Sequence, residues 1–269
     1  MDQAARFCVI GNPVGHSKSP RIHAAFAAQT GLPTHYETCL SPLDGFAATV
    51  AARIAGGDKG ANVTVPFKLE AFALCTRLSA RAQAAGAVNT LTFEDGIAGD
   101  NTDGAGLVAD IVRNAGVPVA GARVLLVGAG GAARGVILPL LEQQPASLTL
   151  VNRTAATAHA VAAHFDGRVT VSSFDALAGP FDIVINATSA SISGSVPPLP
   201  ASVFGAGTLA LDMMYGAAPT AFMDVAARHG ASVRDGLGML VEQAAEAFYV
   251  WRGVRPDTAQ VLAELRSAA

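Results

Sequence analysis

Charged residues are scarce in this chain, making up 14% of its 269 residues against about 25% in an average globular protein. Cysteine is equally sparse: Cys8, Cys39 and Cys75 are the full set, and no Cys-x-x-Cys pair occurs. An odd number at these spacings argues against both a disulfide framework and a zinc site. We therefore expect three small buried hydrophobes and no metal ion.

Long apolar runs are also missing, although 51% of the residues are hydrophobic and the mean hydropathy is +0.39. Arg123 and Arg134 limit the apolar stretch around 124–141, and no segment reaches the roughly 20 residues that a membrane-spanning helix requires. The apolar run within residues 1–10 is too short for a signal-peptide core and lacks a cleavage site. These features predict a cytoplasmic protein without a membrane partner.

Basic runs are absent too, and the formal net charge is −3 with a pI near 6.0. This balance argues against nucleic acid and anionic membrane surfaces as partners. A small-molecule partner remains, and if it is anionic, a few local groups must attract it.

Apolar segments and helical patterns alternate along two series, which predicts an α/β fold with two domains. A polar loop at 99–104, rich in turn formers, separates the series and leads into a helix over 106–114. The expected strands are 7–10, 35–40, 61–65 and 88–93 in a mostly parallel first sheet, then 123–127, 147–151, 181–186 and 208–212; the expected helices are 20–30, 44–55, 132–142 and 154–165.

The end of the chain predicts two amphipathic helices, 239–251 and 256–265, that pack back against the first domain. The segment 189–206, rich in Pro, Ser and Gly, is expected to be a mobile loop. The predicted domains are therefore 1–103 with 237–269, and 104–236.

A glycine-rich turn follows the predicted strand 123–127 and opens a helix. It reads Gly128-Ala129-Gly130-Gly131-Ala132-Ala133, a Gly-x-Gly-x-x-Ala fingerprint in the strand–turn–helix context that dinucleotide binding requires. Gly128 permits the tight turn, Gly130 lets the backbone approach a pyrophosphate, and Ala133 keeps the helix near the sheet. We predict a Rossmann-type domain at 104–236.

The next strand ends in Asn152-Arg153-Thr154, without the acidic residue that holds the ribose of NAD. Arg153 can pair with a 2′-phosphate through its planar fork, and Asn152 and Thr154 can donate hydrogen bonds. A surface arginine at a helix start is the alternative, but the helix dipole disfavours a cation there unless an anion is close. The predicted cofactor is NADP.

The segment Asn62-Val63-Thr64-Val65-Pro66-Phe67-Lys68 carries polar residues along a strand and delivers a lysine just past a proline. Strand alternation sends Asn62 and Thr64 to one face, and the turn after Pro66 can hold Lys68 beside them. A solvated lysine is the plain alternative. Asp103, in the loop at the domain boundary, caps a helix or pairs with Lys68 as a proton-transfer site for carbonyl and alcohol chemistry.

Near the N-terminus, Ser17 and Ser19 lie between a strand and a helix, with Ser19 expected as N-cap and Pro20 as the first helical residue. Capping accounts for Ser19 alone. Ser17 can aim a second hydroxyl into the same crevice, where a small carboxylate would find neutral donors and a favourable dipole.

Taken together, these motifs resemble the shikimate dehydrogenase family, whose members reduce 3-dehydroshikimate with NADPH in aromatic amino-acid and chorismate biosynthesis. The resemblance covers essentially the whole chain. It rests on 11–13, 16–20, 62–68, 86–90, 100–104, the glycine turn, 152–154, 186–189 and 235–240.

The resemblance implies a role for each matching residue. Lys68 would be the acid/base, with Asp103 orienting it and a substrate hydroxyl. Substrate binding would involve the carboxylate ligands Ser17 and Ser19 and the ring-hydroxyl ligands Asn62, Thr64, Asn89, Asp103, Tyr215 and Gln243. Cofactor binding would involve Gly128, Ala129, Gly130, Gly131, Ala132, Asn152, Arg153, Thr154 and Thr188, with Met213 and Gly236 near the nicotinamide.

One departure from the family pattern concerns the cofactor. Thr157 stands where many relatives carry a second basic residue, so the 2′-phosphate clamp is expected to rest on Arg153. Two other functions remain open: a quinate/shikimate dehydrogenase paralogue, and a catalytically silent dinucleotide sensor. The composition leaves open monomer or homodimer.

Overall fold

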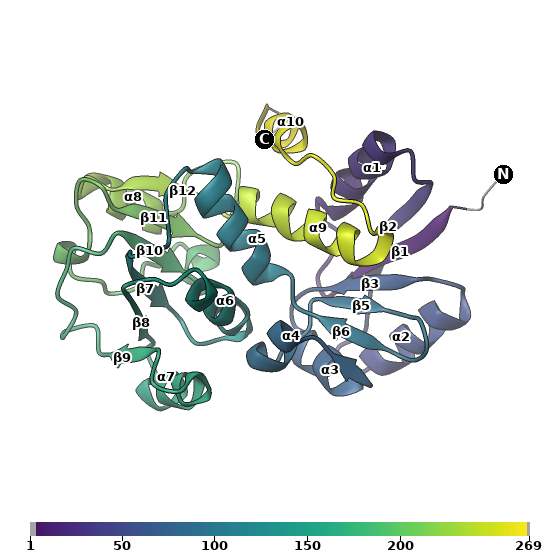
Figure 1. Cartoon of the computed structure of the whole chain (residues 1–269), viewed down its shortest axis with the longest axis horizontal. Helices are drawn as coiled ribbons and strands as arrows, with labels where there is room; N and C mark the ends of the chain where they lie inside the picture. The colour runs from purple at the N-terminus through teal and green to yellow at the C-terminus, as the bar shows by residue number, and fades with distance from the viewer. Residues whose placement is uncertain (1–3, 268–269) are drawn as a thin grey trace. The chain divides into compact units, whose positions relative to one another are not determined.

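The chain folds into two compact units, each built on one β-sheet. A computed structural model describes residues 4–267 (Figure 1). The residues up to Gly106 and those from Val241 onward form the first unit, and Leu107–Leu240 form the second. The first unit is thus discontinuous in sequence, and the second is a single continuous segment.

The first unit contains a six-stranded sheet in the order β2-β1-β3-β5-β6-β4. Strand β1 pairs in parallel with β2 and β3, whereas β5 runs antiparallel to both of its neighbours. The strands are β1 (Ala5–Gly11), β2 (Thr34–Leu40), β3 (Gly60–Val63), β4 (Arg77–Leu78), β5 (Thr90–Thr92) and β6 (Ala98–Asp100).

Side-chain alternation along β1 supplies two separate apolar layers. Cys8 and Ile10 join a core with the buried rings Phe46 and Phe67 on one face. Phe7 points the other way and stacks on Trp251 with the ring centroids 4.5 Å apart. Both faces of the sheet are therefore covered, as a largely parallel sheet requires.

The helices of the first unit include the two that end the chain. Trp251 Nε1 donates a hydrogen bond to Leu91 O at 3.0 Å, and Phe248 contacts Phe26 edge-on. These contacts confirm the predicted packing of the first C-terminal helix against the first domain. The last helix also contacts this domain, since Glu264 O accepts a hydrogen bond from Arg21 Nη2 at 3.5 Å. The helices are α1 (Ser19–Thr30), α2 (Phe46–Ala55), α3 (Lys68–Leu74), α4 (Ala80–Ala85), α9 (Leu237–Arg252) and α10 (Ala259–Ser267).

The second unit contains a fully parallel sheet in the order β12-β11-β10-β7-β8-β9. Strand order reverses at β7, where a doubly wound sheet has its ligand-binding crevice. This is the predicted Rossmann-type fold. The strands are β7 (Arg123–Val127), β8 (Ser147–Val151), β9 (Thr170–Ser172), β10 (Ile183–Asn186), β11 (Leu209–Asp212) and β12 (Ser232–Arg234).

Strands β10 and β11 are buried at every position, which is typical of a parallel sheet covered on both faces. One face packs against Phe222 and Met223 of α8. The helical elements are α5 (Asp103–Ala109), a π-helical turn Asp110–Asn114, α6 (Gly131–Glu142), α7 (Ala155–Ala162), α8 (Ala221–Arg228) and the 3₁₀ turns Ala163–Phe165, Ala190–Ser193 and Ala201–Val203.

Some local predictions are wrong. Cys8 is buried as expected, but Cys39 and Cys75 are only half-buried against the same core. Ser19 is not the N-cap of α1: Lys18 precedes the helix, Ser19 is its first residue, and the hydroxyl of Ser17 accepts a hydrogen bond from Ser19 N. The strand predicted over 61–65 ends at Val63, because the backbone turns into Pro66, which has no N–H to donate. Among the described residues, no helix is long and apolar enough to cross a membrane.

His23 gives the first unit a pH-sensitive stability. Its ring is fully buried and stacks on Tyr36, with centroids 4.0 Å apart, and neither nitrogen has a partner among residues 4–267. Burial lowers the pKa of His23 from 6.5 to about 3, an effect that the nearby Asn62 only partly opposes. Between about pH 6.5 and pH 3, His23 is therefore protonated in the unfolded chain but neutral in the folded chain, so the folded state loses stability as the pH falls.

We predict that His23→Phe, which keeps the stacked ring, flattens the acid side of the stability profile. The wild-type chain should lose stability relative to the variant as pH falls from about 6.5 toward 4, by up to ~1.4 kcal/mol per pH unit. Urea unfolding of both proteins at several pH values measures this difference. Parallel profiles would show that His23 does not titrate as its burial requires.

Candidate active site

Lys68 and Asp103 form an ion pair in the first unit. Lys68 begins α3, just past the turn that ends β3, and Asp103 begins α5. Lys68 Nζ lies 2.5 Å from Asp103 Oδ2, with side-chain exposures of 20% and 8%. The pairing predicted from the sequence is therefore present, in a place where little water competes for the two charges.

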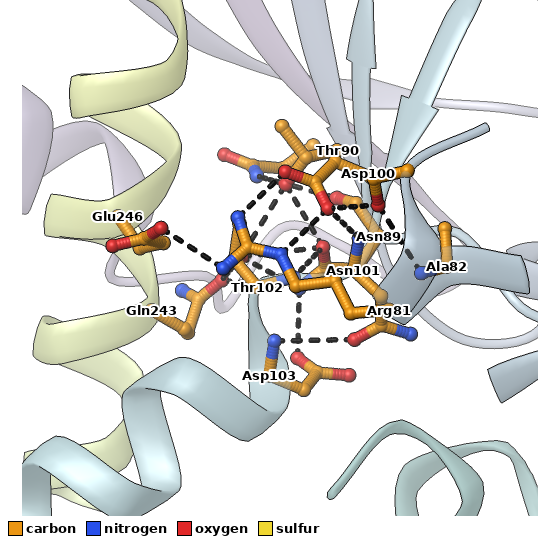
Figure 2. A network of polar contacts seen from close by, with 12 residues as sticks. Arg81, Ala82, Asn89, Thr90, Asp100, Asn101, Thr102, Asp103, Gln243 and Glu246 are labelled. Atoms are coloured by element: carbon orange, nitrogen blue, oxygen red, sulfur yellow. Dashed lines mark hydrogen bonds and ion pairs between the residues drawn. The ribbon is translucent and has the colours of Figure 1, made fainter. Parts of the chain in front are cut away.

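Asn89 is the centre of the polar network around this pair (Figure 2). Its Nδ2 donates to Asp103 Oδ1 at 2.8 Å and to Thr102 Oγ1 at 3.0 Å, and its Oδ1 accepts from Thr102 N at 2.8 Å. One amide thus fixes both the backbone and the carboxylate of the loop that carries Asp103. The second carboxylate oxygen, Oδ2, is left for Lys68.

Gln243 joins the same network from α9. Its Oε1 lies 3.4 Å from both Asn89 Nδ2 and Thr102 Oγ1. Figure 2 shows Gln243 reaching toward Asn89 and Thr102 from the C-terminal helix. Residues 89, 103 and 243, far apart in sequence, are therefore brought to one place.

Asn62 of β3 is also buried and is held by three hydrogen bonds. Its Nδ2 donates to Asn89 O at 3.2 Å and to Thr90 Oγ1 at 3.1 Å, and its Oδ1 accepts from the Tyr36 hydroxyl at 2.7 Å. Thr64 is half-buried, and its amide bonds to β1 through Ile10 O at 2.9 Å. No hydrogen bond joins Lys68 to Asn62 or Thr64 in the described part of the chain.

Tyr36 is a site residue that the sequence reasoning missed. It lies on β2 with a buried ring, and its hydroxyl orients the Asn62 amide. The available signal was the alternation of β2, which turns Tyr36 inward on a strand whose other residues are half-buried or exposed. Burial raises the pKa of Tyr36 well above its usual value, so the hydroxyl stays a donor.

Ser17 and Ser19 lie at the start of α1. Ser19 is buried and Ser17 half-buried, and Ser17 Oγ accepts from Ser19 N at 3.2 Å. Because one hydroxyl meets the first amide of the helix, the two serines sit together at its N-terminal end, where the dipole favours an anion.

The glycine turn of the second unit fits a dinucleotide. Gly128 has a φ of +108°, which favours glycine, and a Cβ there would meet Thr188 Cγ2 at 3.1 Å. Gly130 and Gly131 face open space instead, since a Cβ on either would meet nothing within 4 Å. The uncapped N-terminus of α6 follows, with Ala132 in its first turn and Ala129 buried before it. A pyrophosphate can therefore approach these backbone N–H groups.

The end of β8 also fits NADP. Arg153 and Thr154 are exposed, and Asn152 Nδ2 donates to Thr154 O at 2.9 Å, which shapes the turn. Arg153 makes no hydrogen bond or ion pair with another residue among 4–267. Its guanidinium is therefore available to a phosphate, and no carboxylate stands there to hold the hydroxyl of NAD.

A buried carboxylate organises the loops after β10 and β11. Asp212 Oδ2 accepts from Ser191 Oγ at 2.5 Å and from Thr220 Oγ1 at 2.7 Å, and Oδ1 accepts from Met214 N at 3.0 Å. Tyr215 lines a hollow beside these residues, and burial raises the pKa of its hydroxyl. Asp212 is a second residue that the sequence reasoning missed.

Met213 and Gly236 are in close backbone contact. A Cβ on Gly236 would lie 2.1 Å from Met213 O, and Gly236 N donates to Met214 O at 3.0 Å. Only glycine allows this approach. Thr188 follows β10, where its hydroxyl donates to Asn186 Oδ1 at 2.7 Å.

The predicted residues thus fall into two groups, one in each unit. The acid/base and substrate residues belong to the first unit, apart from Tyr215. Tyr215 and the cofactor residues belong to the second.

The second unit has a Rossmann-type fold, an open glycine turn and an arginine that is not paired with another described residue. The first unit carries a lysine–aspartate pair. Together these features define the class of two-domain NADP-dependent dehydrogenases. Comparison with known proteins narrows the class. Residues 9–91 match the model of the shikimate dehydrogenase substrate binding domain, 110–193 that of shikimate/quinate 5-dehydrogenase, and 236–266 that of the shikimate 5′-dehydrogenase C-terminal domain. The chain belongs to the shikimate dehydrogenase family.

Individual relatives are similar to this chain over nearly its whole length. It is 64% identical over 265 residues to the shikimate dehydrogenase (NADP(+)) of Herminiimonas arsenicoxydans, covering 97% of both chains. It matches the crystal structure of an Ael1 enzyme from Pseudomonas putida with a TM-score of 0.94 and 49% identity, covering 97% of this chain and 98% of that one. The chain also matches the crystal structure of shikimate 5-dehydrogenase from Thermus thermophilus in complex with NADP(H) and shikimate. The TM-score is 0.88 and the sequence identity 33%, and the match covers 98% of this chain and 100% of that one.

We predict that Asn89→Ala destabilises the first unit by about 2–6 kcal/mol, because Thr102 N and Asp103 Oδ1 each lose a buried partner at about 1–3 kcal/mol apiece. Urea unfolding measures the loss. Asn152→Ala removes a hydrogen bond at the surface and should change stability by less than about 0.5 kcal/mol. Equal effects in the two variants would contradict the central position of Asn89.

Proposed function

We propose that this chain is an NADP-dependent oxidoreductase that interconverts 3-dehydroshikimate and shikimate, a step of the shikimate pathway toward chorismate and the aromatic amino acids. The observation that carries the proposal is the Lys68–Asp103 pair, 2.5 Å apart and largely sheltered, within a network of neutral hydrogen-bonding groups. Such a pair suits proton transfer to and from a ring hydroxyl. The curated relatives with this activity match the chain along its length.

Lys68 is the acid/base of the proposed reaction. When bound, NADPH supplies the hydride and NADP⁺ accepts it. Lys68 Nζ gives a proton to the oxygen of the C3 carbonyl during reduction and takes it back during oxidation. Asp103 Oδ2 holds the lysine amine in place, while Asn89 holds Oδ1. Because each oxygen of the Asp103 carboxylate has its own partner, the Lys68 amine is held in one position from which it can transfer a proton.

Substrate recognition is assigned to the neutral donors of the first unit. Ser17 and Ser19, at the start of α1, bind the substrate carboxylate, and the amide and hydroxyl groups around Asn89 bind the ring hydroxyls. This second group comprises Asn62, Thr64, Asn89, Asp103 and Gln243, joined by Tyr215 from the second unit. Hydroxyl-specific sites discriminate strongly, because an analogue without the hydroxyl leaves buried polar groups unpaired.

Cofactor recognition is assigned to the second unit. The glycine turn and the start of α6, from Gly128 through Ala132, bind the pyrophosphate, and Arg153 binds the 2′-phosphate with Asn152 and Thr154 beside it. Thr188 is assigned to the same cofactor site, and Met213 and Gly236 are assigned to its nicotinamide end. The proposed domains are 1–103 with 237–269 for substrate and 104–236 for NADP. The proposed location is the cytoplasm, and the protein acts as a monomer or homodimer.

The strongest rival from another class is a dinucleotide sensor without catalysis. A sensor has no use for a paired lysine and aspartate, and the intact Lys68–Asp103 geometry therefore supports an enzyme. Activity with quinate, the rival within the enzyme class, is less well supported because the curated relatives are shikimate dehydrogenases.

We predict that wild-type protein reduces NADP⁺ with shikimate and that Lys68→Ala lowers kcat by about 10²–10⁴ with little change in KM. Initial rates of NADPH formation measure both constants. Lys59→Ala, at the opposite end of β3 and exposed, is the matched control and should retain activity. A folded wild-type protein that binds NADPH yet turns over no shikimate would support the sensor instead.

We predict that Gly130→Ala weakens NADPH binding about tenfold or more while leaving the fold intact. The new methyl group meets no protein atom within 4 Å, so the free energy of unfolding should change by less than about 1 kcal/mol, whereas a close-lying pyrophosphate would be pushed away. Fluorescence titration with NADPH measures the affinity. Gly205→Ala, with an ordinary 3.6 Å contact in the same unit, should bind NADPH normally. Unchanged affinity in Gly130→Ala would place the pyrophosphate elsewhere.

A further inference from the structure

Arg81 joins two parts of the first unit that carry predicted site residues. Its Nε and Nη2 donate to Asp100 Oδ1 and Oδ2 at 2.7 and 2.6 Å, and its Nη1 donates to Glu246 Oε1 at 2.9 Å. Figure 2 shows the guanidinium between the end of β6, which carries Asp100, and α9, which carries Glu246. All three side chains are at most 23% exposed.

The bridge is made of charged groups. Burial opposes ionisation of Asp100, but the hydrogen bonds and charge of Arg81 hold the pKa of this carboxyl below its usual value. Burial likewise opposes ionisation of Glu246, and Arg255 and Arg81 together lower its pKa. Arg255 Nη2 donates to Glu246 Oε2 at 2.5 Å and fixes the second oxygen. A planar fork that meets one carboxylate with two donors and another with a third is specific to arginine.

One arm of the bridge leads to Asp103. Asp100 Oδ1 also accepts from Asn101 N at 2.7 Å, and Asn101 Nδ2 donates to Ala87 O at 3.0 Å. Asn101 Oδ1 accepts from Asp103 N at 3.2 Å. The position of the Asp100 carboxylate is therefore passed through Asn101 to the first residue of α5, whose carboxylate holds Lys68.

The other arm leads to Gln243. Glu246 follows Gln243 by three residues on α9, so the two side chains share one face of the helix. Anchoring Glu246 fixes the rotation and height of α9 over the sheet. That rotation sets where Gln243 meets Asn89 and Thr102.

We propose that Arg81 is a positioning residue for the reaction: by holding Asp100 and Glu246 at once, its guanidinium sets Asp103 through the 100–103 loop and Gln243 through α9. The inference rests on the proposed function for the roles of Asp103 and Gln243. It assigns no contact between Arg81 and substrate. The Asp100 arm of the bridge governs kcat, and the Glu246 arm governs KM for shikimate.

The first unit offers a matched control for this bridge. Arg53 of α2 also links two carboxylates, with Nε 2.6 Å from Asp58 Oδ2 and Nη2 2.6 Å from Glu37 Oε1. Its side chain is 18% exposed, close to the 23% of Arg81. Within residues 4–267, Arg53 makes no hydrogen bond or ion pair with the 100–103 loop. Replacing Arg53 therefore measures how much stability is lost when an arginine that links two carboxylates is removed away from the site.

The test compares Arg81→Lys with Arg53→Lys. An ammonium cannot reproduce the fork, so both variants should lose similar thermal stability. Arg81→Lys should lower kcat by about 10- to 100-fold, the range expected for a small displacement of reacting groups. It should also raise KM for shikimate several-fold and leave KM for NADP unchanged, whereas Arg53→Lys should leave all three unchanged.

Glu246→Gln separates the two arms. It weakens the contact to α9 and keeps the Arg81–Asp100 fork, so KM for shikimate should rise while kcat stays near that of the wild-type protein. The proposal is overturned if Arg81→Lys matches Arg53→Lys in kcat and KM. It is also overturned if KM for NADP rises as much as KM for shikimate.

Amide hydrogen exchange tests the arrangement without any turnover. The amides of Asn101, Thr102 and Asp103 should exchange faster in Arg81→Lys and at the wild-type rate in Arg53→Lys. If the wild-type protein turned over no shikimate, the proposed function would fail, and this comparison would still decide whether Arg81 holds the loop. Unchanged exchange in Arg81→Lys would overturn the inference even in an active enzyme.

Discussion

The first unit depends on the complete satisfaction of one buried amide, the side chain of Asn89. An amide at 2% exposure must find partners for its donors and its acceptor, or the unit loses about 1–3 kcal/mol for each that fails. Its partners include the backbone and hydroxyl of Thr102, the hydroxyl of Thr90 and the carboxylate of Asp103. The requirement of one side chain thus becomes a geometric constraint on the acid/base pair.

Electrostatics follow from this constraint. A lysine and an aspartate 2.5 Å apart attract each other strongly where water is largely excluded, but a flexible pair would lose that advantage to side-chain entropy. Asn89 holds one carboxylate oxygen and leaves the other to Lys68. In the second unit, the buried carboxylate of Asp212 has a comparable organising role. It accepts hydrogen bonds from the loops after β10 and β11 and from Thr220 at the start of α8.

The parts of the fold that depend on local pattern were predictable from sequence. Strands 123–127 and 147–151 match β7 and β8, because continuous apolar runs bounded by turn formers leave little ambiguity. The glycine turn and the pairing of Lys68 with Asp103 were likewise predictable. Short strands were not: β4 and β6 span two and three residues, and their pairing depends on neighbours that no local window contains. Tyr36, Arg81 and Asp212 were missed for the same reason, since each acts through a partner distant in sequence.

The discontinuity of the first unit also orders events during synthesis. The second unit is one continuous stretch and can complete its parallel sheet as soon as that stretch has emerged. The first unit cannot close then, because Phe7 awaits the ring of Trp251 and Arg81 awaits Glu246. Until α9 leaves the ribosome, the part of the sheet around Phe7 that α9 covers stays exposed, and the domain made first is therefore the domain finished last.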